Sequence, residues 1–123
     1  MSDRRREVGQ KGEQLAAQYL QQQGYEIVER NLRTRQGEID LIALDQQMLV
    51  FVEVRTRTST AYGTPGESVN WRKQKKLREL ALAYLQRQTG RFSSFRFDVI
   101  AITCPARVTD QQQVKIEHVK HAF

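Results

Sequence analysis

The chain has 123 residues and a formal net charge of +6. This length suits one domain and is too short for two ordinary ones. No apolar run approaches the roughly 18–20 residues of a membrane-spanning helix, and the charged N-terminus lacks the apolar segment of a secretory signal. The single cysteine, Cys104, excludes an intrachain disulfide and a cysteine-based zinc site. We expect a cytoplasmic protein without a membrane partner, whose charge either attracts a polyanion such as nucleic acid or serves solubility alone.

The first third of the chain is predicted to form a helix, a strand and a loop. Residues 9–23 show small and apolar residues at helical spacing, including Leu15, Ala16 and Leu20, and Gly24 is expected to end this helix. Residues 25–29 then predict a short strand. The polar, basic residues 31–37 are typical of a loop.

The middle of the chain predicts two central strands. Residues 38–44 and 48–55 carry apolar residues on both faces, which is typical of strands covered by helices, and a short polar turn at 45–47 joins them as an antiparallel hairpin. After a loop, we expect a second helix that begins at residue 69 or 70 and runs to 89, and then strands at 95–103 and 113–119. The order α-β-β-β-α-β-β predicts an α/β domain with a mixed sheet and flanking helices.

Three charged residues interrupt the central strands: Asp40, Glu53 and Arg55. A two-residue turn at 46–47 places Asp40 directly opposite Glu53, with Arg55 on the same face. Two carboxylates at that spacing repel each other unless a cation lies between them, and Mg²⁺ or Mn²⁺ is the ion we expect. The alternative is a plain salt-bridge cluster in which Glu38 faces Arg55.

Glu13 is a further candidate metal ligand. It lies on the rim of the apolar face of the first helix. Because that face packs on the sheet, the Glu13 carboxylate either joins Asp40 and Glu53 or stays an ordinary solvated side chain.

These residues belong to a longer series of motifs. Gly37-Glu38-Ile39-Asp40, followed by Phe51-Val52-Glu53-Val54-Arg55, resembles the Asp…Glu-x-Lys core of the PD-(D/E)XK nuclease superfamily. More narrowly, the chain resembles the YraN-like family of small uncharacterised bacterial proteins over nearly its whole length. The motifs that carry this resemblance are Gly9 with Glu13, Gly24 to Ile27, Arg30 to Arg33, Gly37 to Ala43, Phe51 to Arg57, and Arg96 to Val99.

The resemblance implies a restriction-endonuclease-like fold with an αβββαβ core. It also implies that Asp40 and Glu53 are metal ligands, with Glu13 as a third candidate. Arg55 stands where the superfamily usually has Lys; Arg holds phosphate in a planar fork but keeps its proton, so it cannot act as a general base. Ile39 stands where a Pro is usual. The change to Arg55 counts against efficient cleavage and not against the fold.

Most of the net charge lies between Glu53 and Arg78, where seven basic residues face two glutamates, a local net charge of +5. Five of these cations fall in the first turns of the second helix, where the helix dipole disfavours them. Phosphate binding explains their position better than a solvated surface does. Trp71 and Tyr62 flank this stretch and either stack on a base or, by default, lie partly buried. The predicted nucleic-acid-binding residues are Arg33, Arg35, Arg57, Arg72, Lys73, Lys75 and Lys76.

The residues lead to three functional hypotheses. The first is a metal-dependent endonuclease that acts on branched or flapped DNA, with Asp40, Glu53, Arg55 and Glu13 as its catalytic residues. The second is a nucleic-acid-binding module that kept the fold and lost cleavage, and the third is a role in protein interaction. We expect DNA rather than RNA as the partner. The sequence does not decide whether the chain forms a homodimer.

Overall fold

The computed structural model describes residues 2–57, 69–88, 94–103 and 114–123, and from Gly9 onward also their side chains. Its elements are α1 (Ser2–Gln22), β1 (Glu26–Thr34), β2 (Gly37–Asp45), β3 (Met48–Arg57), α2 (Trp71–Gln86), β4 (Ser94–Thr103) and β5 (Lys115–Val119). The α/β class and the order of elements are confirmed. The expected loop before α2, with Tyr62, lies outside the described residues. The second helix, expected to run to residue 89, ends earlier, at Gln86, with Arg87 as its C-cap.

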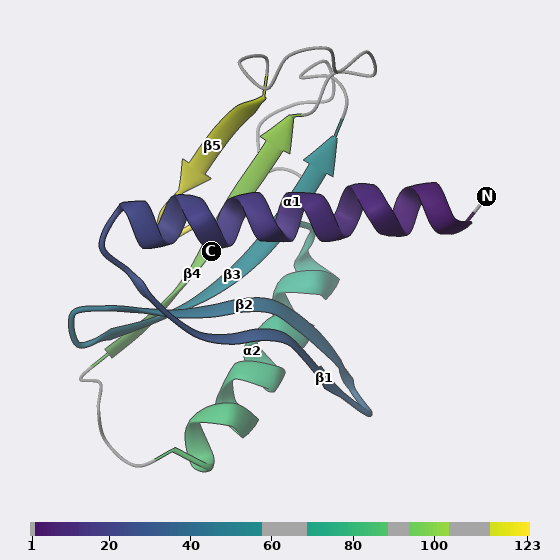
Figure 1. The fold of residues 1–123 in the computed structure, drawn as a ribbon. Coiled ribbons are helices and arrows are strands. Elements are labelled where there is room, and N and C mark those ends of the chain that lie inside the picture. Colours follow the sequence, from purple (N-terminus) through teal and green to yellow (C-terminus); the bar gives the residue numbers. More distant parts are fainter. Residues whose placement is uncertain (1, 58–68, 89–93, 104–113) are drawn as a thin grey trace.

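The five strands form one sheet in the order β1-β2-β3-β4-β5. Strands β3 and β4 are parallel, and the other neighbours are antiparallel, so the sheet is mixed as predicted. A parallel pair needs a crossover connection, which α2 supplies between β3 and β4. Helix α1 crosses one face of the sheet and α2 covers the other (Figure 1).

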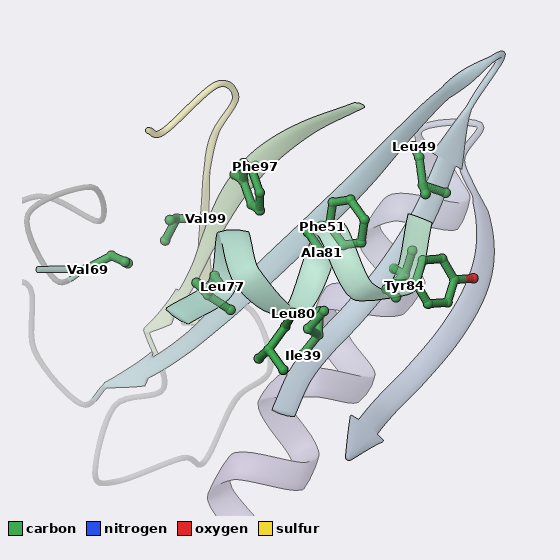
Figure 2. Close-up of a cluster of buried hydrophobic side chains, with 11 residues drawn as sticks. Ile39, Leu49, Phe51, Val69, Leu77, Leu80, Ala81, Tyr84, Phe97 and Val99 are labelled. Carbon is green, nitrogen blue, oxygen red and sulfur yellow. The ribbon is translucent and has the colours of Figure 1, made fainter. Parts of the chain in front are cut away.

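Strands β2 and β3 are buried on both faces, which confirms their prediction as central strands. Leu41 and Val52 pack with Ala16, Ala17 and Leu20 of α1. On the opposite face, buried side chains of β2, β3 and β4 pack against α2, and Figure 2 shows this cluster of apolar residues. The two helices are therefore held by alternate residues of the same strands.

The register of the β2–β3 hairpin is the predicted one. Asp45 pairs with Met48 at the turn and Leu41 pairs with Val52 farther along. Gln46 takes a positive φ of 58°, which suits the tight turn between the two strands. Turn length and the alternation of buried residues therefore determine which residues of β2 and β3 lie opposite each other.

Two further predicted boundaries, in the first third of the chain, are wrong. Residues 31–34, expected to lie in a loop, continue β1, because β1 is an edge strand whose exposed side chains are polar and show no apolar alternation. Helix α1 begins at Ser2 rather than at residue 9, since Arg and Glu favour a helix without contributing apolar periodicity.

The helix ends follow local rules. Gly24, at a φ of 93°, ends α1 as predicted, and the amide of Tyr25 donates to the Leu20 carbonyl at 3.0 Å. Asn70 caps α2, because its side chain accepts a hydrogen bond from the Lys73 amide at 2.9 Å. The cap fixes where α2 begins, and with it the position of Lys73 in the first turn.

None of the described helices is long and apolar enough to cross a membrane.

Candidate functional site

Asp40 and Glu53 lie where β2 and β3 separate. The backbone pairing of the two strands ends at Leu41 and Val52, and Figure 1 shows the β1–β2 hairpin and the end of β3 running in different directions. The Asp40 Oδ2 atom accepts a hydrogen bond from the Val54 amide at 2.8 Å, so a side chain replaces the backbone acceptor that the ladder no longer supplies. Asp40 and Glu53 are therefore neighbours through their side chains, although the predicted backbone pairing stops one residue earlier. We call this place the fork.

The two carboxyl groups at the fork influence each other strongly. Burial raises the pKa of Asp40 to about 8, and a hydrogen bond to Glu53 and its negative charge add to the effect. The hydrogen bond from the Val54 amide lowers the pKa of Asp40, but by less than these effects raise it. At neutral pH, Asp40 therefore holds a proton that it shares with Glu53 when no cation is bound.

Glu53 forms ion pairs with two cationic side chains. Its side chain is only 6% exposed, and its Oε2 atom lies 3.2 Å from Lys73 Nζ and 3.3 Å from Arg55 Nη2. Lys73 comes from α2, so this helix contributes directly to the fork. The Nε atom of Arg55 is buried and has no hydrogen-bond partner among the described residues.

The predicted alternative, a Glu38–Arg55 pair, is wrong. Glu38 lies against Arg33 of the neighbouring strand β1, at 3.5 Å, and Arg55 pairs with Glu53 instead. Glu38 is therefore paired within the β1–β2 hairpin, with Arg33, and not with Arg55.

Glu13 lies near the fork, on helix α1, which passes very close to β3. Gly12 has no room for a side chain: a Cβ atom there would overlap the Thr56 hydroxyl and lie 3.2 Å from the Thr56 Cβ. Burial raises the pKa of Glu13, and the negative charges of Glu38 and Glu53 contribute further. The structure therefore brings Glu13 into the electrostatic field of the fork.

Asn31 holds the Glu13 carboxylate, a role that the sequence did not suggest. Asn31 Nδ2 donates to Glu13 Oε2 at 2.9 Å, and Asn31 takes a positive φ of 51° within β1. Asn tolerates this conformation better than most residues, which is the only local signal for its position. Glu13 and Asn31 also line a hollow of about 260 Å³ between α1 and β1.

The oxygen donors available to a cation are the carboxylates of Asp40 and Glu53, with Glu13 nearby. Across the described residues, no three or more His, Cys, Asp or Glu side chains converge as a complete metal-binding group. A cation at the fork would therefore take its remaining ligands from water or substrate.

The predicted nucleic-acid-binding residues fall into separate groups. Lys73 belongs to the fork, whereas Arg72, Lys75 and Lys76 are exposed on α2. Trp71 is 69% exposed, so the expectation that it is partly buried is wrong. The first turns of α2 therefore present cations and an aromatic ring together to solvent.

The remaining arginines lie on other elements. Arg33 and Arg35, at the tip of the β1–β2 hairpin, line a groove of about 670 Å³ against α2, together with Arg87. Arg57 forms an ion pair with Glu117 of β5 at 3.0 Å, so its guanidinium is engaged away from the basic turns of α2.

A second group of charged residues is buried in β4. Arg96 and Asp98 form an ion pair within β4, with 2.9 Å between Arg96 Nε and Asp98 Oδ1. His118 Nε2 lies 2.7 Å from Asp98 Oδ2, and Tyr19 of α1 hydrogen-bonds to the other nitrogen of His118. Burial works to raise the pKa of Asp98, but the hydrogen bonds from His118 and Arg96 and the charge of Arg96 hold it below its ordinary value. The network ties α1 and β5 to β4.

Comparison with known proteins places the chain in a family. Residues 12–102 match the model described as "Uncharacterised protein family UPF0102". A UPF0102 protein from Rhodococcus opacus is 47% identical over 116 residues, which cover 94% of this chain and 95% of that protein. One from Geobacter metallireducens is 45% identical over 123 residues, covering this chain fully and 97% of its own length. One from Symbiobacterium thermophilum is 53% identical over 97 residues, 79% of this chain and 82% of its own.

The matched region includes the fork, Glu13 and the basic turns of α2. The likeness extends over nearly the full length of the first two relatives, in agreement with the order of motifs along this chain. The chain therefore belongs to the uncharacterised protein family UPF0102, as its YraN-like motifs predicted.

Proposed function

We propose that this protein is a divalent-metal-dependent endonuclease of the PD-(D/E)XK type, which hydrolyses phosphodiester bonds in branched or flapped DNA. The observation that carries the proposal is the fork itself. Asp40 and Glu53 lie together there, within the field of Glu13, and Glu53 is in contact with the cations Arg55 and Lys73. The order of helices and strands also agrees with the αβββαβ core of that superfamily.

The residues at the fork fit Mg²⁺ or Mn²⁺. Mg²⁺ is usually held by one or two carboxylates and completes its shell with water and substrate phosphate. Asp40 and Glu53 would supply those carboxylates, with Glu13 beside them. When bound, the ion supplies a nucleophilic water at neutral pH and neutralises negative charge on the phosphodiester.

The chain's own cations would hold the substrate. The Arg55 side chain is 38% exposed and its guanidinium plane suits a phosphate, so it would hold the scissile group. The exposed cations of α2 and of the hairpin tip would contact phosphates on either side. Because phosphate contacts position a nucleic acid without reading its sequence, selectivity would depend on the structure of the DNA.

A second candidate function is a nucleic-acid-binding module without cleavage. One observation favours it: Arg55 and Lys73 both contact the same Glu53 oxygen, so the charge of that carboxylate is balanced without a metal ion. The arginine in place of the usual lysine supports the same candidate, because arginine keeps its proton.

The test is cleavage of end-labelled flapped, branched, single-stranded and duplex DNA with Mg²⁺ or Mn²⁺. We expect Asp40→Asn and Glu53→Gln to lose at least about 10²-fold in rate, as is typical when an electrostatic group of an active site is removed. Glu79→Gln is the matched control, because Glu79 is an exposed carboxylate on α2. Cleavage that survives both fork variants would exclude the proposed site.

Thermal melting gives a second readout that does not depend on turnover. A cation that binds the folded state raises the melting temperature, so Mn²⁺ should stabilise the wild type and Glu79→Gln but not the Asp40→Asn/Glu53→Gln double variant. Salt-dependent DNA binding without a metal shift and without cleavage would favour the binding module.

A further inference from the structure

Trp71 is exposed without a local structural reason. It is the first residue of α2 and is 69% exposed, more than any other large apolar side chain among the described residues. Helix α2 begins at this point because Asn70 caps it, which requires no tryptophan at the next position. A large aromatic side chain left in water gains free energy from any partner that covers it.

One aromatic ring and two cations lie along the same face of α2, and the second cation packs near the ring of the C-terminal Phe123. Trp71, Lys75 and Arg78 follow the spacing of one helix face. Lys75 Nζ lies 5.5 Å from the centre of the Trp71 ring, and the Arg78 guanidinium lies 5.7 Å from the centre of the Phe123 ring. The first turn of the helix contains no acidic residue, so the charge of this face suits a polyanion.

The same helical turn connects this face to the fork. Lys73, two residues beyond Trp71, contacts Glu53. Residues two apart on a helix point to nearly opposite sides, so the Trp71 ring points away from the fork and lies about one helix diameter, ~10 Å, from the Lys73 side of the helix. A nucleic-acid strand that reaches the fork would pass the Trp71 ring within a few nucleotides.

We propose that Trp71 stacks on an unpaired base of a single-stranded segment next to the fork, while Lys75 and Arg78 hold the flanking phosphates. The inference rests on the proposed function for its substrate and deepens it, because it names nucleic acid with unpaired nucleotides as the preferred ligand. Bases in an uninterrupted duplex are stacked on each other, so they offer no free face to the indole. Aromatic stacking combined with cations is the usual way in which proteins hold single strands.

Intrinsic fluorescence tests the stacking directly, because Trp71 is the only tryptophan in the chain. The probe is an oligothymidylate of about 12 nucleotides, added in EDTA so that no cleavage occurs. We expect the strand to quench the emission of Trp71 and to protect the ring from iodide. A blunt duplex of the same length should do neither to a comparable extent.

Affinity measured by anisotropy of the labelled strand gives the second readout. Trp71→Ala should weaken binding by about 5- to 150-fold, the range typical of one lost base stack, and Trp71→Phe should keep most of the affinity. Leu82→Ala is the matched control, because Leu82 is also exposed on α2 but lies about 16 Å along the helix. Its affinity should equal that of the wild type.

The outcomes separate this inference from the proposed nuclease activity. If the strand binds without quenching, and Trp71→Ala binds as well as the wild type, the stacking role is wrong even where cleavage still depends on Asp40 and Glu53. If quenching and its loss in the variant are seen but no metal supports cleavage, the nuclease proposal fails and the stacking role stands. Absence of binding to single-stranded DNA and RNA overturns the inference and points to another occupant of this face.

Discussion

Lys73, in the first turn of α2, forms an ion pair with Glu53 of β3, with 3.2 Å between Lys73 Nζ and Glu53 Oε2. The contact joins a crossover helix to a central strand at the point where β2 and β3 separate. The candidate site is therefore assembled from several elements, and its electrostatics depend on how α2 packs on the sheet.

Removal of the Lys73 charge should weaken the fold modestly. In Lys73→Gln, the nearly buried Glu53 carboxylate keeps Arg55 alone as a cationic partner among the described residues. Because the Lys73 side chain is 42% exposed, solvent screens the ion pair, and we expect a loss of about 1 kcal/mol in the free energy of unfolding. Urea unfolding measures it, with exposed Lys75→Gln as the control; equal stability of the two variants would contradict the role of Lys73.

Asp40 should make the metal-free protein less stable as the pH rises. Its pKa in the folded protein is raised to about 8 from the ordinary value of 3.8, mainly by burial. The folded state thus keeps a proton that the unfolded chain releases, so the stabilisation is full below about pH 4 and is lost as the pH rises through 8.

Asp40→Asn isolates this effect. The amide oxygen can still accept from Val54, and the amide nitrogen can donate to Glu53 as the protonated acid does. We expect the variant to match the wild type near pH 4 and to be more stable near pH 9, by urea unfolding in EDTA. A stability difference that is the same at both pH values would show that Asp40 is ionised throughout.

Gly12 should be required for the close contact between α1 and β3. Gly12→Ala places a methyl group against Thr56, and we expect a loss of about 1–3 kcal/mol in the free energy of unfolding. Gly9→Ala is the matched control in the same helix, because an added Cβ there has nothing within 4 Å, and it should stabilise by about 0.5–1 kcal/mol. Thermal and urea unfolding distinguish the two, and Thr56→Ala should partly rescue Gly12→Ala.

Asp98 should be the most sensitive charged residue of the core. It is fully buried and accepts hydrogen bonds from Arg96, His118 and the His121 amide. Asp98→Asn removes the buried counter-ion of Arg96 and leaves it paired with the partly exposed Asp45. We expect this to cost about 3 kcal/mol, whereas Tyr19→Phe removes one hydrogen bond and should cost about 1 kcal/mol. Similar unfolding free energies for the two variants would argue against a charged network.

The pH dependence of the Asp98 contribution has the opposite sign to that of Asp40. The pKa of Asp98 is held below its ordinary value, so the folded state binds a proton less readily than the unfolded chain does. Its stabilisation is present above about pH 4 and is lost as the pH falls through the lower, folded-state pKa. The difference between wild type and Asp98→Asn should therefore shrink in acid.

Much of the fold could be predicted from local patterns. The β2–β3 register followed from turn length and the alternation of apolar residues, and Gly24 marked the end of α1. The full extent of β1 could not be predicted, because its ladder is held by backbone hydrogen bonds to β2 while its exposed side chains remain polar. The exposure of Trp71 could not be predicted either, because the local sequence at the start of a helix does not show whether another element covers the side chain.

The sequence by itself determined the α/β order, the neighbourhood of Asp40 and Glu53, and the family, because these depend on short-range periodicity and on motifs in series. Only the tertiary structure decided three side-chain contacts of the site and its surroundings. Lys73 contacts Glu53, Arg57 forms an ion pair with Glu117, and Asn31 donates a hydrogen bond to Glu13. Each of these contacts joins elements that are distant along the chain. Their geometry depends on how closely helices and strands pack, and at Gly12 that distance is set by the absence of a single side chain.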